Sequence, residues 1–204
     1  MVRLASLLAF AALASAQTGS WPQFRGPNGS GVGEGAGYPV AFGPAANVAW
    51  KAAVPYGQSS PVVAGGRVYV TATDGGRLLT ISLDAQSGKE VWRRPLPRTH
   101  AHKTYPANDP ASPSPAADPT GVYVFFADFG LAAFNTDGSE RWRMPLGPFK
   151  NFYGMSNSPI LSGDSVILVL DQQPGAAMIA VDRTTGKLKW KTERRSATIG
   201  WATP

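Results

Sequence analysis

The chain has 204 residues, a formal net charge of +6 and a hydrophobic content of 43%, which is too apolar for an intrinsically disordered polypeptide. It contains no cysteine, so neither a disulfide nor thiol chemistry can contribute. The 23 glycines and 18 prolines supply many turns, and no segment after the first sixteen residues keeps a helical apolar period. We therefore expect an all-β protein with almost no helix.

The N-terminus carries the pattern of a secretory signal peptide. A basic start with Arg3 precedes an apolar stretch over residues 4–13, and Ala14 and Ala16 fit the small-x-small cleavage rule. Ten apolar residues are too few to span a bilayer. We predict a signal peptide over residues 1–16, an N-terminal extension over 17–46, and an exported protein, periplasmic or secreted, with no transmembrane segment and no nucleic-acid partner.

One pattern then occurs three times. Each copy opens with Ser-Pro, has a valine seven residues after the proline, and closes with a tryptophan 31, 27 or 31 residues after the proline. The prolines are Pro61, Pro115 and Pro159, the valines Val68, Val122 and Val166, and the tryptophans Trp92, Trp142 and Trp190. Each copy contains four short strand patterns, and four strands in about 45 residues are typical of a β-propeller blade.

The repeat predicts the organisation of residues 47–204 as an incomplete β-propeller of four-stranded antiparallel blades. We place the blades at about 57–97, 111–147 and 156–195, and a fourth begins at about residue 202. Three blades cannot close a ring. We therefore expect the N-terminal part of a longer protein whose ring has seven or eight blades.

The closing segments carry a family resemblance. Residues 180–190 match the pattern Ala-x-Asp-x-x-Thr-Gly-x-x-x-Trp, residues 82–92 match it with Ser for Ala and for Thr, and residues 133–142 match it with one residue fewer. This resembles the tryptophan-docking motif of pyrroloquinoline-quinone-type (PQQ-type) propeller repeats. Residues 21–28 also resemble the start of exported, environmental-bacterial members of that superfamily. The resemblance implies a structural docking role for Trp92, Trp142, Trp190, Gly88, Gly138, Gly186, Asp84 and Asp182.

The motif also has a direct physical interpretation. Asp and Ser or Thr flank a tight turn in which the glycine can take a positive φ. The tryptophan offers a large apolar surface to the neighbouring blade, and its indole N–H needs a carbonyl acceptor. This packing role is favoured over stacking on a ligand. Residues 47–51, with Trp50, resemble a closing strand without its three predecessors, and we predict that they form the outer strand of the last blade, without its strand partners in this chain.

The turns between second and third strands share one end of the propeller with the links between blades, and this end is the candidate ligand face. Its candidate residues are His100, His102, Lys103, Tyr105, Asp128, Tyr153, Asp171 and Arg195. For these aspartates, and for Asp74 at the equivalent position of the first repeat, turn formation is favoured over a ligand role. His100 and His102 could hold a metal or supply a base, but no third ligand has a familiar spacing, so we predict no metal site.

Basic residues gather beside the closing tryptophans. On an outermost strand they would prevent edge-to-edge pairing; alternatively, they form a rim that binds a polyanion. They are Arg93, Arg94, Arg98, Arg141, Arg143, Lys187, Lys189, Lys191, Arg194 and Arg195.

Three functions remain open. The favoured one is an exported noncatalytic propeller, a scaffold or binding module that presents its channel mouth or rim to an envelope protein or small ligand, with no catalytic residue and no cofactor. The alternative implied by the resemblance is a quinoprotein dehydrogenase that oxidises alcohols or sugars with PQQ and calcium and uses an Asp as base. A hydrolase or lyase ranks last, because the sequence has no nucleophile elbow or paired carboxylates. The oligomeric state stays open.

Overall fold

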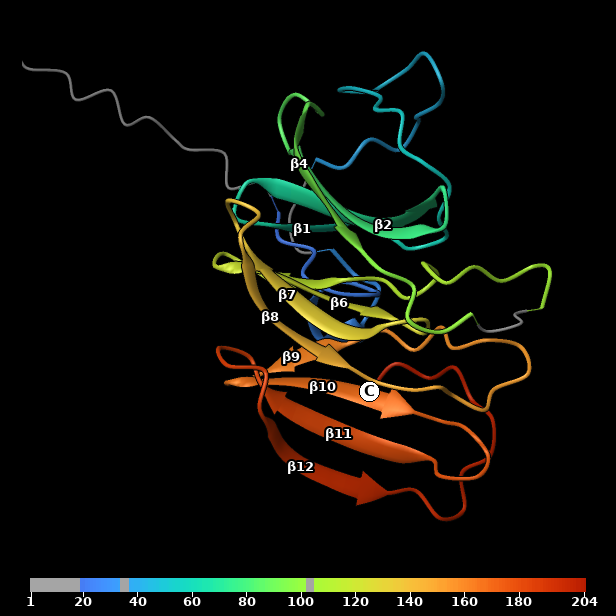
Figure 1. Ribbon diagram of the computed structural model, residues 1–204. Coiled ribbons are helices and arrows are strands. Elements are labelled where there is room, and N and C mark those ends of the chain that lie inside the picture. Colours follow the sequence, from blue (N-terminus) through green and yellow to red (C-terminus); the bar gives the residue numbers. More distant parts are fainter. Residues whose placement is uncertain (1–18, 34–36, 102–104) are drawn as a thin grey trace, which may run out of the picture.

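The computed structural model describes residues 19–33, 37–101 and 105–204, and its strands form three four-stranded antiparallel sheets (Figure 1). The predicted signal peptide and the candidates His102 and Lys103 lie outside the described residues. The first sheet contains β1 (Val62–Ala64), β2 (Arg67–Asp74), β3 (Arg77–Asp84) and β4 (Glu90–Leu96). The second contains β5 (Ala116–Asp118), β6 (Gly121–Phe126), β7 (Gly130–Asn135) and β8 (Glu140–Pro145), and the third β9 (Ile160–Ser162), β10 (Ser165–Leu170), β11 (Ala177–Asp182) and β12 (Leu188–Glu193).

The strands of each sheet follow one another in chain order, as in a propeller blade. The predicted all-β fold of partial propeller blades is confirmed, and the only helical element among the described residues is a short 3₁₀ turn, η1 (Pro27–Gly29). No helix in the described part of the chain is long and apolar enough to cross a membrane. We refer to the three sheets as the first, second and third blade.

Burial follows the position of each blade in the stack. Every residue of β6 is buried, because the second blade has a neighbour on both faces. Successive side chains of a strand point to opposite faces. Accordingly, Val124 and Phe126 pack into the cluster shared with the first blade, and Tyr123 and Phe125 pack into the cluster shared with the third. In the third blade, all of β12 is exposed.

The first strands β1, β5 and β9 approach one another, whereas the outer strands β4, β8 and β12 fan apart (Figure 1). The first strands therefore form the axial side of the stack. The N-terminal segment of residues 19–33 lies along this side. Trp21 exchanges two backbone hydrogen bonds with Val63 of β1, at 2.9 and 2.8 Å, and Ala117 of β5 donates one to the Pro22 carbonyl at 2.8 Å.

The turns define two opposite ends of the blades. At one end the turn between third and fourth strands meets the turn between first and second strands: Ala85 N–H bonds the Gly66 carbonyl at 3.1 Å, and Arg183 N–H bonds that of Asp164 at 3.0 Å. We call this the turn end. At the opposite link end, the links between blades lie against the turns between second and third strands, as when Thr99 N–H bonds the Asp128 carbonyl at 2.9 Å.

Candidate functional site

At the turn end, three tryptophans make the same contact with the blade that follows. The indole N–H groups of Trp50, Trp92 and Trp142 donate to the backbone carbonyls of Ala85, Thr136 and Arg183 at 3.0, 2.9 and 2.9 Å. These carbonyls occupy equivalent positions, each one residue after the Asp or Asn that starts the turn. The contact therefore repeats in register from blade to blade.

Each indole also covers a turn glycine. A Cβ atom on Gly88, Gly138 or Gly186 would lie 2.4, 2.8 or 2.6 Å from the nearest ring atom of the docked tryptophan. These glycines have φ values of 69°, 83° and 70°, which disfavour any residue with a side chain. Glycine is thus required at these positions for two reasons: the backbone has a positive φ, and the indole ring leaves no space for a Cβ atom.

The turn carboxylates are fixed by local hydrogen bonds. The Oδ1 of Asp84 accepts from the backbone N–H of Ser87 at 2.8 Å and from its hydroxyl at 2.7 Å, and Asp182 accepts from Thr185 at 2.8 and 2.9 Å. Hydrogen bonds from the Ser87 hydroxyl and backbone lower the pKa of Asp84, and those from the Thr185 backbone and hydroxyl lower the pKa of Asp182. Both aspartates therefore act here as turn-forming groups.

Trp50 and Trp190 differ from each other. Residues 47–51 form no strand, in line with a closing segment that lacks its strand partners in this chain, and the Trp50 indole docks on the first blade like the others. Trp190 has no indole acceptor among the described residues, and 39% of it is exposed, against 6% for Trp92. The exposed face of β12 thus presents the only one of these four indoles that no described turn covers.

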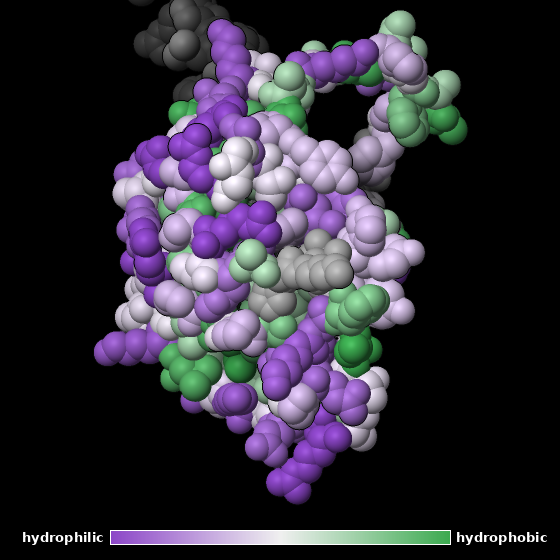
Figure 2. All heavy atoms as spheres, turned by 45° about the vertical axis from the view of Figure 1, so that its right-hand side comes forward, coloured by the Kyte–Doolittle hydropathy of each residue, from purple (hydrophilic) through white to green (hydrophobic). Residues whose placement is uncertain are grey.

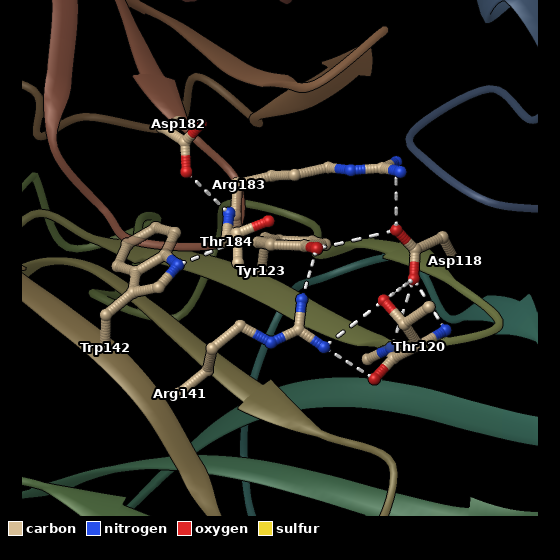
Figure 3. A network of polar contacts seen from close by, with 9 residues as sticks. Asp118, Thr120, Tyr123, Arg141, Trp142, Asp182, Arg183 and Thr184 are labelled. Atoms are coloured by element: carbon tan, nitrogen blue, oxygen red, sulfur yellow. Dashed lines mark hydrogen bonds and ion pairs between the residues drawn. The ribbon is translucent and has the colours of Figure 1, made fainter.

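A polar network beside the turn end joins the second and third blades (Figure 3). Arg141 donates to the Tyr123 hydroxyl at 2.6 Å and to the Thr120 carbonyl at 2.7 Å, while Asp118 accepts from Arg183 of the third blade at 3.3 Å. Burial, and the nearby Asp118 carboxylate, raise the pKa of Tyr123. The network joins two blades, and the guanidinium of Arg141 is occupied by hydrogen bonds to Tyr123 and Thr120.

Other basic residues of the rim are paired as well. Arg93 bonds Glu90 at 2.6 Å along β4, and Arg143 pairs in the same way with Glu140 along β8. In β12 the residue equivalent to the glutamates is Leu188, which is half exposed. The charged outer strands of the first two blades therefore carry paired charges, which favours edge protection over a polyanion-binding rim.

At the link end, two of the predicted candidates are carboxylates with arginine partners. Asp128 is fully buried, and its Oδ2 accepts from Arg98 Nε at 2.7 Å and Nη2 at 2.5 Å. Asp171, 5% exposed, accepts from Arg194 Nε at 2.8 Å and Nη2 at 3.3 Å. Charged groups removed from water need such partners, so both carboxylates hold the links in place.

The other described candidates fall into separate places. His100 lies in the link over the second blade, where its backbone N–H bonds the Asp128 carbonyl at 3.1 Å. Arg195 has a side chain 89% exposed and pairs with Glu193 at 3.3 Å. The structure brings only Tyr105 and Tyr153 side by side, with ring centroids 5.7 Å apart.

These two tyrosines belong to a larger aromatic cluster, which we call the aromatic hollow. The Tyr153 ring lies 5.6 Å from that of Trp201 and 5.1 Å from that of Phe152. The hollow has a volume of about 270 Å³. Its lining residues are Tyr105, Ala107, Asn108, Tyr153, Ser156 and Trp201. Asn108 was missed as a candidate because it belongs to no motif.

Figure 2 looks toward the side on which the links lie and shows hydrophobic residues scattered among polar ones. Calcium takes six to eight oxygen ligands. Residues 19–33, 37–101 and 105–204 contain no cluster of three or more metal-ligating side chains, and Asp128 and Asp171 are already bound by arginines. This part of the chain does not fit a PQQ–calcium site.

Four-stranded antiparallel sheets, each joined to the next by a tryptophan indole that packs on a glycine turn, define a PQQ-like β-propeller repeat protein. A family model described as "Outer membrane protein assembly factor BamB" matches residues 40–202, and the chain belongs to that family. The chain is 27% identical over 140 residues to the outer membrane protein assembly factor BamB of Alkalilimnicola ehrlichii, which covers 68% of this chain and 33% of the relative. It thus spans about a third of the length of that relative.

Comparison with solved structures supports the fold in one case. A europium-containing methanol dehydrogenase superposes with a TM-score of 0.52 at 16% identity, over 69% of this chain and 25% of the other. BamB from Moraxella catarrhalis gives a TM-score of 0.48 at 20% identity, over 72% and 42%.

Proposed function

We propose that this protein is an exported, noncatalytic propeller scaffold of the cell envelope, which presents its link end to another envelope protein. The observation that carries the proposal is the use of the two buried carboxylates of the link end, Asp128 and Asp171, in arginine pairs. A general base needs a carboxylate that can reach a substrate proton. Both groups are instead committed to holding loops.

The axial side supports the same proposal. In PQQ-dependent enzymes that resemble this repeat, the cofactor is held in the channel. Here the free edges of β1 and β5, which face that channel, are covered by residues 19–33 through the hydrogen bonds of Trp21 and Pro22. The membership in the BamB family favours a role in assembly at the outer membrane.

The proposal is tested by site-specific photo-cross-linking in intact cells that produce the full-length protein. A benzophenone amino acid replaces Tyr105 at the link end or Gln86 in the exposed turn of the opposite end. We expect one dominant, saturable cross-linked product from position 105, competed by excess unlabelled protein, and none from position 86. Equal products from both positions would contradict a link-end interface.

The enzymatic alternative has its own assay. Purified full-length protein is mixed with PQQ and calcium, and its absorbance and dye-linked oxidation of alcohols and sugars are recorded. We expect neither a bound chromophore nor turnover. A bound quinone with turnover above that of the denatured protein would replace the scaffold proposal by the dehydrogenase.

A further inference from the structure

We propose that the aromatic hollow at the link end is a binding site for a proline-rich peptide segment in the polyproline II conformation. The proposal rests on the proposed scaffold function and names the chemistry of the partner. Pro-rich segments dock in aromatic-lined grooves, where their preformed helix loses little entropy on binding.

The first observation is convergence. Tyr105, Tyr153 and Trp201 come from three different links between blades, and they form a ladder of rings with neighbouring centroids 5.7 and 5.6 Å apart. Their exposed fractions are 50%, 44% and 45%. Three large rings that gather while staying half exposed are a feature of interaction sites, in which aromatic residues are enriched.

The second observation is preorganisation. Asn108 Nδ2 bonds the Tyr153 carbonyl at 2.8 Å, and the Trp201 indole N–H bonds the Gly154 carbonyl at 3.0 Å. Asn157 Nδ2, from a buried residue, bonds the Ala202 carbonyl at 3.0 Å beside Trp201. The three links are therefore tied to one another, and the rings keep their positions without a ligand.

The third observation is the chemistry of the lining. None of the six lining residues is charged, so the hollow fits an uncharged segment better than an ionic ligand. Within the described part of the chain the Tyr105 and Tyr153 hydroxyls have no hydrogen-bond partner, and a polyproline II backbone leaves its carbonyls free to accept from such donors. Donor and acceptor thus complement each other.

The geometry also favours a peptide over a sugar. The neighbouring rings are inclined at 58° and 70°, so they form separate walls rather than one flat platform on which a sugar ring could stack. Side chains on one face of a polyproline II helix recur every third residue, about 9 Å apart. Because this spacing exceeds the 5.7 and 5.6 Å between neighbouring rings, two such prolines would contact the outer rings of the ladder, Tyr105 and Trp201, on either side of Tyr153.

The test is fluorescence anisotropy with the full chain and a labelled peptide of four Pro-Pro-Ala repeats. Trp201→Ala removes one wall, and Phe42→Ala removes an exposed aromatic ring outside the hollow. We expect saturable binding, a dissociation constant raised about tenfold or more by Trp201→Ala, and no change with Phe42→Ala. Tyr105→Phe, which keeps the ring and removes only the hydroxyl, should weaken binding by about threefold or more.

Three results would overturn the inference. These are no binding by the wild-type chain, equal loss in Trp201→Ala and Phe42→Ala, and binding of an N-acetylglucosamine oligomer at the hollow in place of the peptide. If position 105 gives the expected cross-link in cells but the peptide does not bind, the scaffold proposal is supported and the peptide-binding proposal is wrong. Turnover with PQQ would remove the scaffold proposal whatever the peptide does.

Discussion

Gly186→Ala tests how tightly an indole of one blade is held by the turn of the next. The new Cβ atom would lie 2.6 Å from Cδ2 of Trp142 and 2.8 Å from two further ring atoms. The indole is rigid, so it must move outward, and this movement weakens the 2.9 Å bond from its N–H to the Arg183 carbonyl. The substitution therefore perturbs the contact between the second and third blades.

The expected magnitude has two parts. A side chain in the left-handed region costs about 1 kcal/mol, because φ at Gly186 is 70°. Overpacking against a well-packed neighbour costs about 1 to 3 kcal/mol more. Gly66→Ala is the matched control, since its φ is 73° and no heavy atom lies within 4 Å of its Cβ position. It should cost about 1 kcal/mol only.

The assay is urea unfolding followed by tryptophan fluorescence and by circular dichroism. We expect the midpoint for Gly186→Ala to fall well below that for Gly66→Ala, with the slope unchanged. Equal midpoints for the two variants would refute the close contact between the indole and the turn, because backbone strain alone would then explain both losses.

Two further predictions concern charges. Arg98→Met removes the arginine that pairs with the buried Asp128 carboxylate and should destabilise the protein by about 2 to 3 kcal/mol in urea unfolding, while Arg195→Ala, which breaks an exposed pair, should change stability by less than about 0.5 kcal/mol. The pKa of Asp182 is lower in the folded protein than in the unfolded chain, where it is about 4. The ionised carboxylate therefore stabilises the fold fully above the unfolded-state pKa, and this stabilisation is lost as the pH falls through the folded-state pKa. The melting temperature of Asp182→Asn should therefore fall less than that of the wild type between about pH 5 and pH 3; a fall of equal size would contradict the role of this carboxylate.

The sequence predicted the blades because their constraints repeat. Each closing tryptophan lies opposite the third strand beside a β-bulge, as in the pairs Ser82 with Trp92 and Ala133 with Trp142, and each turn needs a glycine of positive φ. A constraint that recurs at fixed spacing can be recognised from one chain. The all-β architecture therefore follows from the pattern alone.

The N-terminal segment could not be placed in this way. It is held to β1 and β5 by backbone groups, as in the two bonds between Trp21 and Val63, and backbone hydrogen bonds carry no residue signature. Trp50 was recognised as resembling a closing tryptophan, but its docking without a strand depends on the carbonyl of Ala85 and the absence of a Cβ atom on Gly88. Such complementarity becomes visible only when the chain is folded.

The arginine partners of the aspartates were missed for a related reason. Asp128 and Asp171 recur at nearly equivalent positions of the repeat, but Arg98 comes from the link that precedes the blade of its aspartate and Arg194 from the link that follows it. The two arginines do not share a repeat position, since they follow their tryptophans by six and four residues. A partner that does not recur at a fixed repeat position cannot be recognised from the repeat, so the sequence indicated turn-forming aspartates and not ion pairs.

This contrast suggests where recognition is located in the molecule. Residues that repeat from blade to blade, such as Trp92 and Gly138, are buried in contacts between blades, because every blade packs on its neighbour in the same way. The links have no such shared task, and their lengths differ. Tyr105, Tyr153 and Trp201 do not repeat, yet they converge from three links. Packing between blades does not require these three rings to converge. We therefore attribute their convergence to partner binding, which substitutions in the aromatic hollow can test.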